Sequence, residues 1–133
     1  VDTRALTKIL RNQGSMNGML TCAEHFNVAE IMEKLKTKYP DAAFVLTLGE
    51  KGSWYFDKTR CFKQDIYKVK AVDTTAAGDT FCGYFLSGIT KGREIPEILK
   101  TASAASAIAV SRNGAAPSIP EYEEVEKFVA ERG

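Results

Sequence analysis

The chain has 133 residues, which is about the length of one ordinary domain. Hydrophobic residues make up 44% of it and charged residues 26%, the composition of a soluble globular protein. A net charge of +1 gives no reason to expect nucleic acid or a membrane surface as a partner. No apolar run approaches the roughly 18 residues that a bilayer-spanning segment needs.

The cysteines and the start of the chain bear on its compartment. Cys22, Cys61 and Cys82 are widely spaced and form no CxxC pair, which favours reduced thiols over a disulfide or a zinc site. The polar N-terminus lacks a basic-then-apolar signal segment, so a cytoplasmic location is the default expectation. His25 is the only histidine, and without a recognisable nucleophile it is expected to be structural or solvated rather than catalytic.

Two amphipathic helices are predicted near the start of the chain. Residues 2–14 combine a capping Asp2, an apolar stripe and a terminal Gly14, and a turn and a short strand follow. The second helix, at residues 27–39, is expected to begin at Asn27. Its apolar stripe is expected to pack against the core: Val28, Ile31, Met32 and Leu35.

Strands and tight turns are predicted next. Residues 42–48 form a continuous apolar run, which is typical of a strand buried on both faces in a parallel sheet. After a glycine turn at 49–52, residues 53–56 and 61–67 predict an antiparallel hairpin appended to that sheet. The helix-then-strand order indicates an α/β protein. The Gly-x-x-Gly element is either a simple turn or a place where a ligand approaches the backbone.

A strand-like run at 67–72 gives way to a helix-like run at 80–89 through three small residues, Ala76, Ala77 and Gly78. Small side chains let backbone N–H groups crowd around an anion, and the helix N-terminus adds its positive dipole end. This junction is therefore a candidate phosphate-binding turn.

Asp79 stands in the first turn of that helix, beside any phosphate that the turn would hold. A carboxylate there repels a resting phosphate but suits a base that accepts a proton from an attacking hydroxyl during phosphoryl transfer. The alternative is that Asp79 only complements the helix dipole and that Gly-Asp-Thr is an ordinary turn and cap. Spacing alone leaves both interpretations open.

The remaining residues predict two helices joined by a Gly/Pro loop. Residues 97–110, which follow a break around Pro96, are rich in Ala and Ser, and such small residues serve close helix packing, a flat ligand, or both. The loop at 111–120 offers backbone carbonyls either to water or to a cation. A final amphipathic helix at 121–132 is expected to turn its apolar residues inward: Val125, Phe128 and Val129.

Two motifs carry a resemblance to a known family. Asp73-Thr-Thr-Ala-Ala-Gly-Asp-Thr-Phe81 resembles the C-terminal signature of the ribokinase-like (PfkB) carbohydrate kinases. Thr47-Leu-Gly-Glu-Lys-Gly52 resembles that family's TLGxxG element, which lies against the nucleotide. The resemblance covers residues 38–133. It implies a truncated ribokinase-like three-layer α/β/α fold with a mostly parallel sheet and an appended hairpin.

The resemblance also implies a site. Asp79 would deprotonate a sugar hydroxyl that attacks the γ-phosphate of Mg-ATP, and the anion hole would be formed by Ala76, Ala77 and Gly78. Nucleotide contacts would come from Thr47, Gly49, Gly52 and Thr75. The loop at 111–120 is similar to one that, with the segment around Asp73, surrounds a monovalent cation such as K⁺. By position its ligands would be Asp73, Thr75, Ala109, Arg112, Gly114 and Ser118.

A second resemblance concerns the first residues. Asp2–Thr7 and Gly14–Gly18 are similar to the DTRALT helix and the GxxNG turn of the carbamoyl-phosphate synthetase small subunit, over residues 1–20 and at most to 38. None of that subunit's glutaminase triad is recognisable, so the resemblance transfers no activity. The chain is interpreted as a hybrid of a segment at 1–37 and a kinase segment at 38–133.

Two functional hypotheses follow. The first is the nucleotide-binding and catalytic portion of an ATP-dependent sugar kinase, incomplete as it stands because the family's substrate-binding Gly-Gly segment and lid strands have no counterpart here. The second is a non-catalytic folded fragment that keeps only the scaffold. A truncated parallel sheet would expose an edge or a face, so self-association is also expected. The sequence does not name the sugar.

Overall fold

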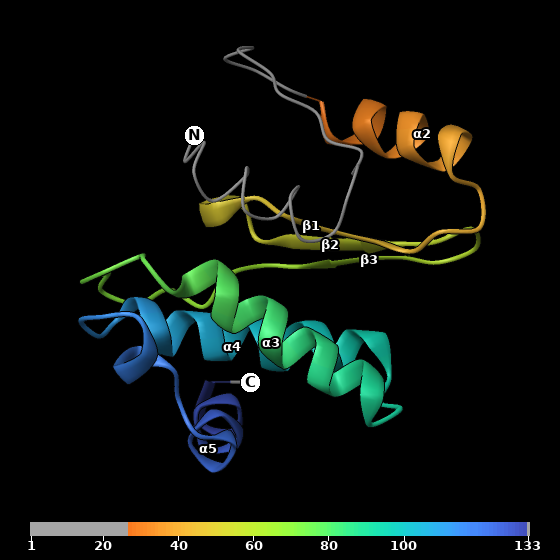
Figure 1. Cartoon of the computed structure of the whole chain (residues 1–133). Coiled ribbons are helices and arrows are strands. Elements are labelled where there is room, and N and C mark those ends of the chain that lie inside the picture. The colour runs from red at the N-terminus through yellow and green to blue at the C-terminus, as the bar shows by residue number, and fades with distance from the viewer. Residues whose placement is uncertain (1–26, 133) are drawn as a thin grey trace, which may run out of the picture. The chain divides into compact units, whose positions relative to one another are not determined.

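The structure is a computed structural model that describes residues 27–132 (Figure 1). The chain divides into two compact units, Val1–Ile31 and Met32–Gly133. No helix within the described range is long and apolar enough to cross a membrane.

Several predictions fall outside the described residues. They are the helix at 2–14, the turn and strand after it, and the environments of Cys22 and His25. Of the first unit only residues 27–31 are described. The domain boundary predicted after residue 37 stays a prediction.

Helix α2 spans Val28–Lys38, close to its predicted bounds. The side-chain Oδ1 of Asn27 accepts a hydrogen bond from the backbone N–H of Ala29 at 3.0 Å. This bond satisfies one of the N–H groups that a helix start leaves unpaired, so the predicted cap is confirmed. The predicted apolar stripe is only half-buried, and no residue of α2 is fully buried.

Three short strands form one sheet in the order β1-β2-β3, with bounds Phe44–Thr47, Ser53–Phe56 and Cys61–Gln64. In the register Tyr55 lies between Val45 and Phe62, so these three side chains share one face of the sheet. Phe56 points to the opposite face, where the ammonium group of Lys36 lies 5.9 Å from the centroid of its ring. The hairpin predicted from the sequence is confirmed as β2 and β3.

The mostly parallel sheet that the sequence predicts is not found among the described residues. Both strand pairings are antiparallel, and β1 pairs with β2 alone in this part of the chain. The run at 42–48 is not buried on both faces either, because Val45 is 39% exposed. An apolar run reveals that a strand is suited to burial, but it does not reveal which strand lies beside it.

Three helices complete the described chain: α3 at Ala77–Thr90, α4 at Ile95–Val110 and α5 at Tyr122–Arg132. All three confirm predicted helices. Helix α4 begins at Ile95 rather than at Glu97, because Pro96 fits the first helical turn, where its missing N–H costs nothing. Helices α3 and α4 lie side by side below the sheet in Figure 1.

The core lies between the sheet and the helices. The ring of Tyr55 is 6.3 Å from that of Phe85 in α3, measured between centroids, and Leu99 of α4 is buried in the same cluster. Val125 of α5 is buried against α4, as predicted. Helix α4 therefore contacts the sheet, α3 and α5 at once, and it is the element against which the site is built.

Candidate functional site

A cavity of about 780 Å³ lies between the loop after β1, the start of α3 and the middle of α4. Pockets for small organic ligands measure about 300 to 1,000 Å³, so this volume suits such a ligand. All of its lining belongs to the Met32–Gly133 unit. The lining brings together five residues that the sequence predicts as site residues: Thr47, Gly49, Gly52, Ala77 and Gly78.

The loop after β1 forms one wall, and its glycines are required by the backbone. Gly49 and Gly52 have φ of +56° and +83°, in the left-handed region that side chains disfavour. A Cβ on Gly52 would lie 2.2 Å from the backbone oxygen of Gln64. The N–H of Leu48 donates to the carbonyl of Gly52 at 2.9 Å, which closes the loop. The predicted tight turn is confirmed.

A second wall comes from the segment between β3 and α3. The strand predicted at 67–72 does not form. Instead, the N–H groups of Val72 and Asp73 donate to the same carbonyl, that of Val110, at 2.8 and 3.1 Å. The end of α4 therefore holds this segment in place of a neighbouring strand.

Sequence reasoning missed the cavity residues of that segment. They are Ile66, Tyr67, Lys68, Val69 and Ala71. Their place in the chain could have indicated them, because this segment connects the two motifs that are predicted to hold the ligand.

Helix α4 supplies a third wall through small side chains. Ser103, Ser106 and Ala107 line the cavity, while its other small residues are buried against neighbouring helices: Ala102, Ala104 and Ala105. Close helix packing is thus confirmed, and the residues on the cavity face leave room for a ligand, which stays a prediction.

The turn at the start of α3 is the fourth wall. Ala76 is buried and does not line the cavity. The N–H of Ala77 donates to the carbonyl of Thr74 at 3.3 Å, within the turn. The N–H groups of Gly78 and Asp79 belong to the first helical turn, where N–H groups have no partner within the helix. Of the predicted anion hole, Gly78 is thus the residue whose N–H is best placed for a ligand.

Gly78 also differs from the loop glycines in what surrounds it. Its φ is not positive, and an added Cβ would meet no atom within 4 Å. Neither backbone strain nor packing therefore requires glycine at this position. The open space beside it is room into which a ligand could approach the backbone.

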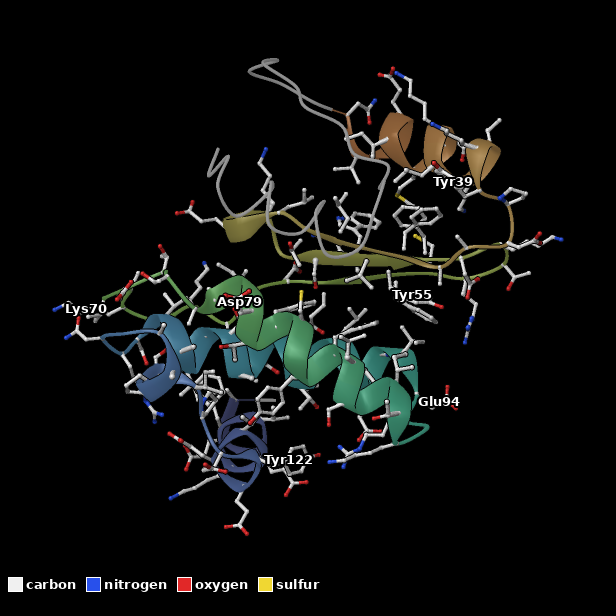
Figure 2. All side chains as sticks on the ribbon, viewed as in Figure 1. Tyr39, Tyr55, Lys70, Asp79, Glu94 and Tyr122 are labelled. Atoms are coloured by element: carbon white, nitrogen blue, oxygen red, sulfur yellow. The ribbon has the colours of Figure 1, made fainter. Side chains whose placement is uncertain are left out.

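Asp79 is exposed in the first turn of α3, as predicted (Figure 2). It is not part of the cavity lining. Asp79 thus lies outside the cavity lining, next in the chain to Gly78, which lines it.

Asp73 joins the signature to the loop after α4. One carboxylate oxygen accepts hydrogen bonds from the N–H and the hydroxyl of Thr75, and the other accepts the N–H of Gly114 at 3.0 Å. The hydroxyl of Thr75, followed by the two backbone N–H groups, holds the pKa of Asp73 below its usual value. Three of the predicted cation ligands are thus brought together.

The other predicted cation ligands lie in or beside the same loop. Ala109 and Ser118 are buried, and the Ser118 hydroxyl donates to the carbonyl of Ala115 at 2.7 Å. The guanidinium of Arg112 pairs with Glu124 of α5, so only the backbone carbonyl of Arg112 is available to an ion. Thr75, also predicted as a nucleotide contact, does not line the cavity.

A site for Mg²⁺ built from side chains alone is not present among residues 27–132, because no cluster of three or more His, Cys, Asp or Glu residues occurs there. Mg²⁺ bound to a nucleotide keeps several waters and takes its other ligands mainly from phosphates.

The fold and the cavity define an α/β protein with a ligand site between a glycine loop and a helix start. The sequence model of the pfkB family carbohydrate kinases matches residues 11–122, and the chain belongs to this family. The fission yeast Schizosaccharomyces pombe has a ribokinase that is 43% identical over 101 residues, which are 75% of this chain and 32% of that protein.

Solved structures agree with this assignment. Arabidopsis thaliana ribokinase, in complex with ribose and ATP, is 30% identical with a TM-score of 0.72, over 77% of this chain and 34% of that one. A related E. coli structure that contains ATP and Mg²⁺ is 25% identical with a TM-score of 0.74, over 82% of this chain and 35% of that one. The ribokinase-like fold is thus confirmed, and the chain spans about a third of the length of these relatives.

The comparisons give no support to the synthetase resemblance. The kinase family match begins at residue 11 and so includes part of the segment attributed to the synthetase small subunit. The hybrid interpretation therefore rests on the first residues alone and stays a prediction.

Proposed function

We propose that this chain carries the nucleotide-binding and phosphoryl-transfer portion of an ATP-dependent carbohydrate kinase. The observation that carries the proposal is the single cavity in which the glycine loop after β1 meets the first turn of α3. A nucleotide needs a surface for its base and backbone donors for its phosphates. The small residues of α4 and the glycine loop offer the surface, and the first turn of α3 offers the donors.

In this proposal the base lies against the small residues of α4 and the phosphates extend toward Gly78. The first-turn N–H groups and the dipole of α3 stabilise negative charge on the phosphoryl group as it is transferred. Mg²⁺ bound to the phosphates supplies additional positive charge. Thr47, Gly49 and Gly52 fix the opposite side of the nucleotide.

Asp79 is the general base of the proposed reaction. The sugar hydroxyl oxygen forms a bond to the γ-phosphorus, the bond to the β–γ bridging oxygen breaks, and ADP leaves. The hydroxyl proton passes to the Asp79 carboxylate. Its exposed position outside the cavity suits this role, because the acceptor must approach the γ-phosphate from the side away from the leaving group.

A monovalent cation is proposed beside the signature. The hydrogen bond between Asp73 and Gly114 supports it, because it joins the two segments that carry the proposed ligands. Carbonyl and carboxylate oxygens suit K⁺, a hard cation. The ion would stabilise the turn that presents Gly78.

A second candidate function is nucleotide binding without transfer. The cavity proposed for the nucleotide lies within the described residues, and Asp79 is not part of its lining. A chain that spans a third of its relatives' length would then bind ATP and leave sugar binding to residues elsewhere.

Calorimetric titration of the purified chain with Mg-ATP, in K⁺ and then in a bulky organic-cation buffer, tests the proposal. Saturable binding that is stronger in K⁺ is expected. Sugar-dependent ADP release, measured across a panel of pentoses and hexoses, then separates the kinase from the second candidate. Absence of binding in both buffers would leave only the scaffold and contradict both candidates.

The edge of the sheet at β1, which has no second partner strand among the described residues, supports a further proposal, that copies of the chain associate. Within the described residues β1 is paired on one side only, and unpaired edges offer a row of free N–H and C=O groups. Size-exclusion chromatography with light scattering is expected to show dimers or larger species. A single monomeric species would contradict self-association.

The predicted cytoplasmic location is a separate proposal, which cell fractionation would test.

A further inference from the structure

The start of α3 carries no side-chain cap. Ala76 occupies the position before the first helical residue, where Ser, Thr, Asp or Asn would normally accept a bond from a free N–H. A cap of that kind would occupy an N–H group that the proposed function assigns to a phosphate. Apart from backbone bonds, such as that from the Thr80 N–H to the Ala76 carbonyl at 2.9 Å, the helix start must therefore be held by another element.

A hydroxyl from α4 holds it. The Oγ of Ser106 donates a hydrogen bond to the backbone carbonyl of Ala77 at 3.0 Å, across 29 residues of sequence. Both residues line the cavity. The bond reaches the carbonyl side of the turn and leaves the N–H side unoccupied.

The bond is not the one that a serine in a helix makes by default. Hydroxyls in helices commonly bond a carbonyl three or four residues back in their own helix, as Thr101 does with Glu97 at 2.9 Å. Ser106 instead bonds the neighbouring helix. Thr101 and Ser106 thus offer a matched comparison between a hydroxyl that bonds within α4 and one that bonds α3.

The geometry of the peptide bond links this contact to the ligand. The carbonyl of Ala77 and the N–H of Gly78 belong to one planar trans peptide, in which they point in opposite directions. A second donor on the Ala77 carbonyl restrains this peptide, and with it the direction of the Gly78 N–H.

From this contact we infer that Ser106 is a positioning residue for the phosphates of the nucleotide. It orients the Ala77–Gly78 peptide so that the Gly78 N–H points to the ligand, while the N–H side of the turn stays free. The inference deepens the proposed function and rests on it for the nature of the ligand.

Two measurements on the full chain test the inference, with Ser106→Ala, Ser106→Thr and the control Thr101→Val. The first needs no ligand: hydrogen exchange of the Thr80 and Phe81 amides, whose bonds close the first turn of α3. Loss of one neutral hydrogen bond predicts exchange about three- to tenfold faster in Ser106→Ala. Ser106→Thr restores the slow rate, and Thr101→Val leaves these amides unchanged.

The second measurement compares calorimetric affinities for Mg-ATP and for adenosine, which lacks phosphates. Ser106→Ala is expected to weaken Mg-ATP binding about three- to tenfold and to leave adenosine binding unchanged. Ser106→Thr recovers the Mg-ATP affinity. Equal losses for both ligands would mean that Ser106 is merely part of the wall around the base and would overturn the inference.

The two measurements separate failure of the inference from failure of the proposed function. If the unmodified chain binds neither ligand, the proposed function fails, and the exchange rates still decide whether Ser106 holds the turn. Unchanged exchange in Ser106→Ala overturns the inference whether or not a nucleotide binds.

Discussion

Two glycine-containing turns meet at the cavity, and they contain glycine for different reasons. In the loop after β1, Gly52 has a positive φ and an added Cβ would collide with the backbone of Gln64. At the start of α3, Gly78 has neither a positive φ nor any atom within 4 Å of an added Cβ. The backbone of the protein explains the first glycine, whereas the second is not required by the protein and lines the cavity.

This difference separates two kinds of motif. A glycine that the backbone conformation requires is needed for the fold, whether or not a ligand binds. A glycine that nothing in the protein requires, and that also lines a cavity as Gly78 does, is evidence for a ligand. The signature turn is therefore the stronger indication of a ligand, although both turns line the same cavity.

The largest expected effect is on turnover, from Asp79→Asn in the signature turn. Removal of a general base is expected to lower sugar-dependent ADP release by about 100- to 10,000-fold, because the hydroxyl proton has no acceptor. Mg-ATP affinity and the midpoint of urea unfolding should stay nearly unchanged, since Asp79 is exposed. Unchanged turnover in a coupled ADP assay would remove Asp79 as the base.

Gly52→Ala is expected to act on stability instead. The collision with Gln64 and the positive φ together predict a loss of about 2 kcal/mol or more in the free energy of unfolding, measured by urea denaturation. If the variant unfolds at the same urea concentration as the unmodified chain, the loop glycine is not required by the backbone and the comparison between the two turns breaks.

Gly78→Ala adds the same methyl group at the other turn. Alanine in a helix is favoured over glycine by about 0.5 to 1 kcal/mol, so stability should rise slightly or stay level. Mg-ATP affinity should fall about tenfold, because the methyl group occupies the space beside the N–H. Gly83→Ala is the matched control: it lies in the same helix, also has no atom near an added Cβ, and should leave affinity unchanged.

The smallest expected effect is on stability at low pH. The pKa of Asp73 is lowered in the folded state, so its contribution to stability is present above the unfolded pKa of about 3.9 and is lost as the pH falls through the folded value. The urea midpoint should therefore fall more steeply below about pH 4 in the unmodified chain than in Asp73→Asn. Identical pH profiles would show that the bonds to Thr75 and Gly114 do not stabilise the fold.

The sequence predicted the helices well because their signals are local. The cap at Asn27, the inward Val125 and the small residues of α4 all follow from patterns within one element. The site was predicted through two motifs, and the structure gathers five of the residues they imply around one cavity.

The features that the sequence does not predict depend on contacts between elements that are distant in the chain. The run at 42–48 looks the same whether its partner strand is parallel or antiparallel, and only the hydrogen bonds to β2 decide. The segment at 67–72 resembles a strand, yet its N–H groups bond the end of α4. Ser106 is one small residue among many until its distance to Ala77 is known.

Helix α4 also sets the distance between two contacts that hold the site together. Ser106, which holds the start of α3, and Val110, whose carbonyl holds the segment before Asp73, lie on one rigid helix about one turn apart. Inserting a residue between them would rotate one contact by about 100° relative to the other and move it about 1.5 Å along the axis. The spacing of these two residues is therefore under tighter constraint than their identities.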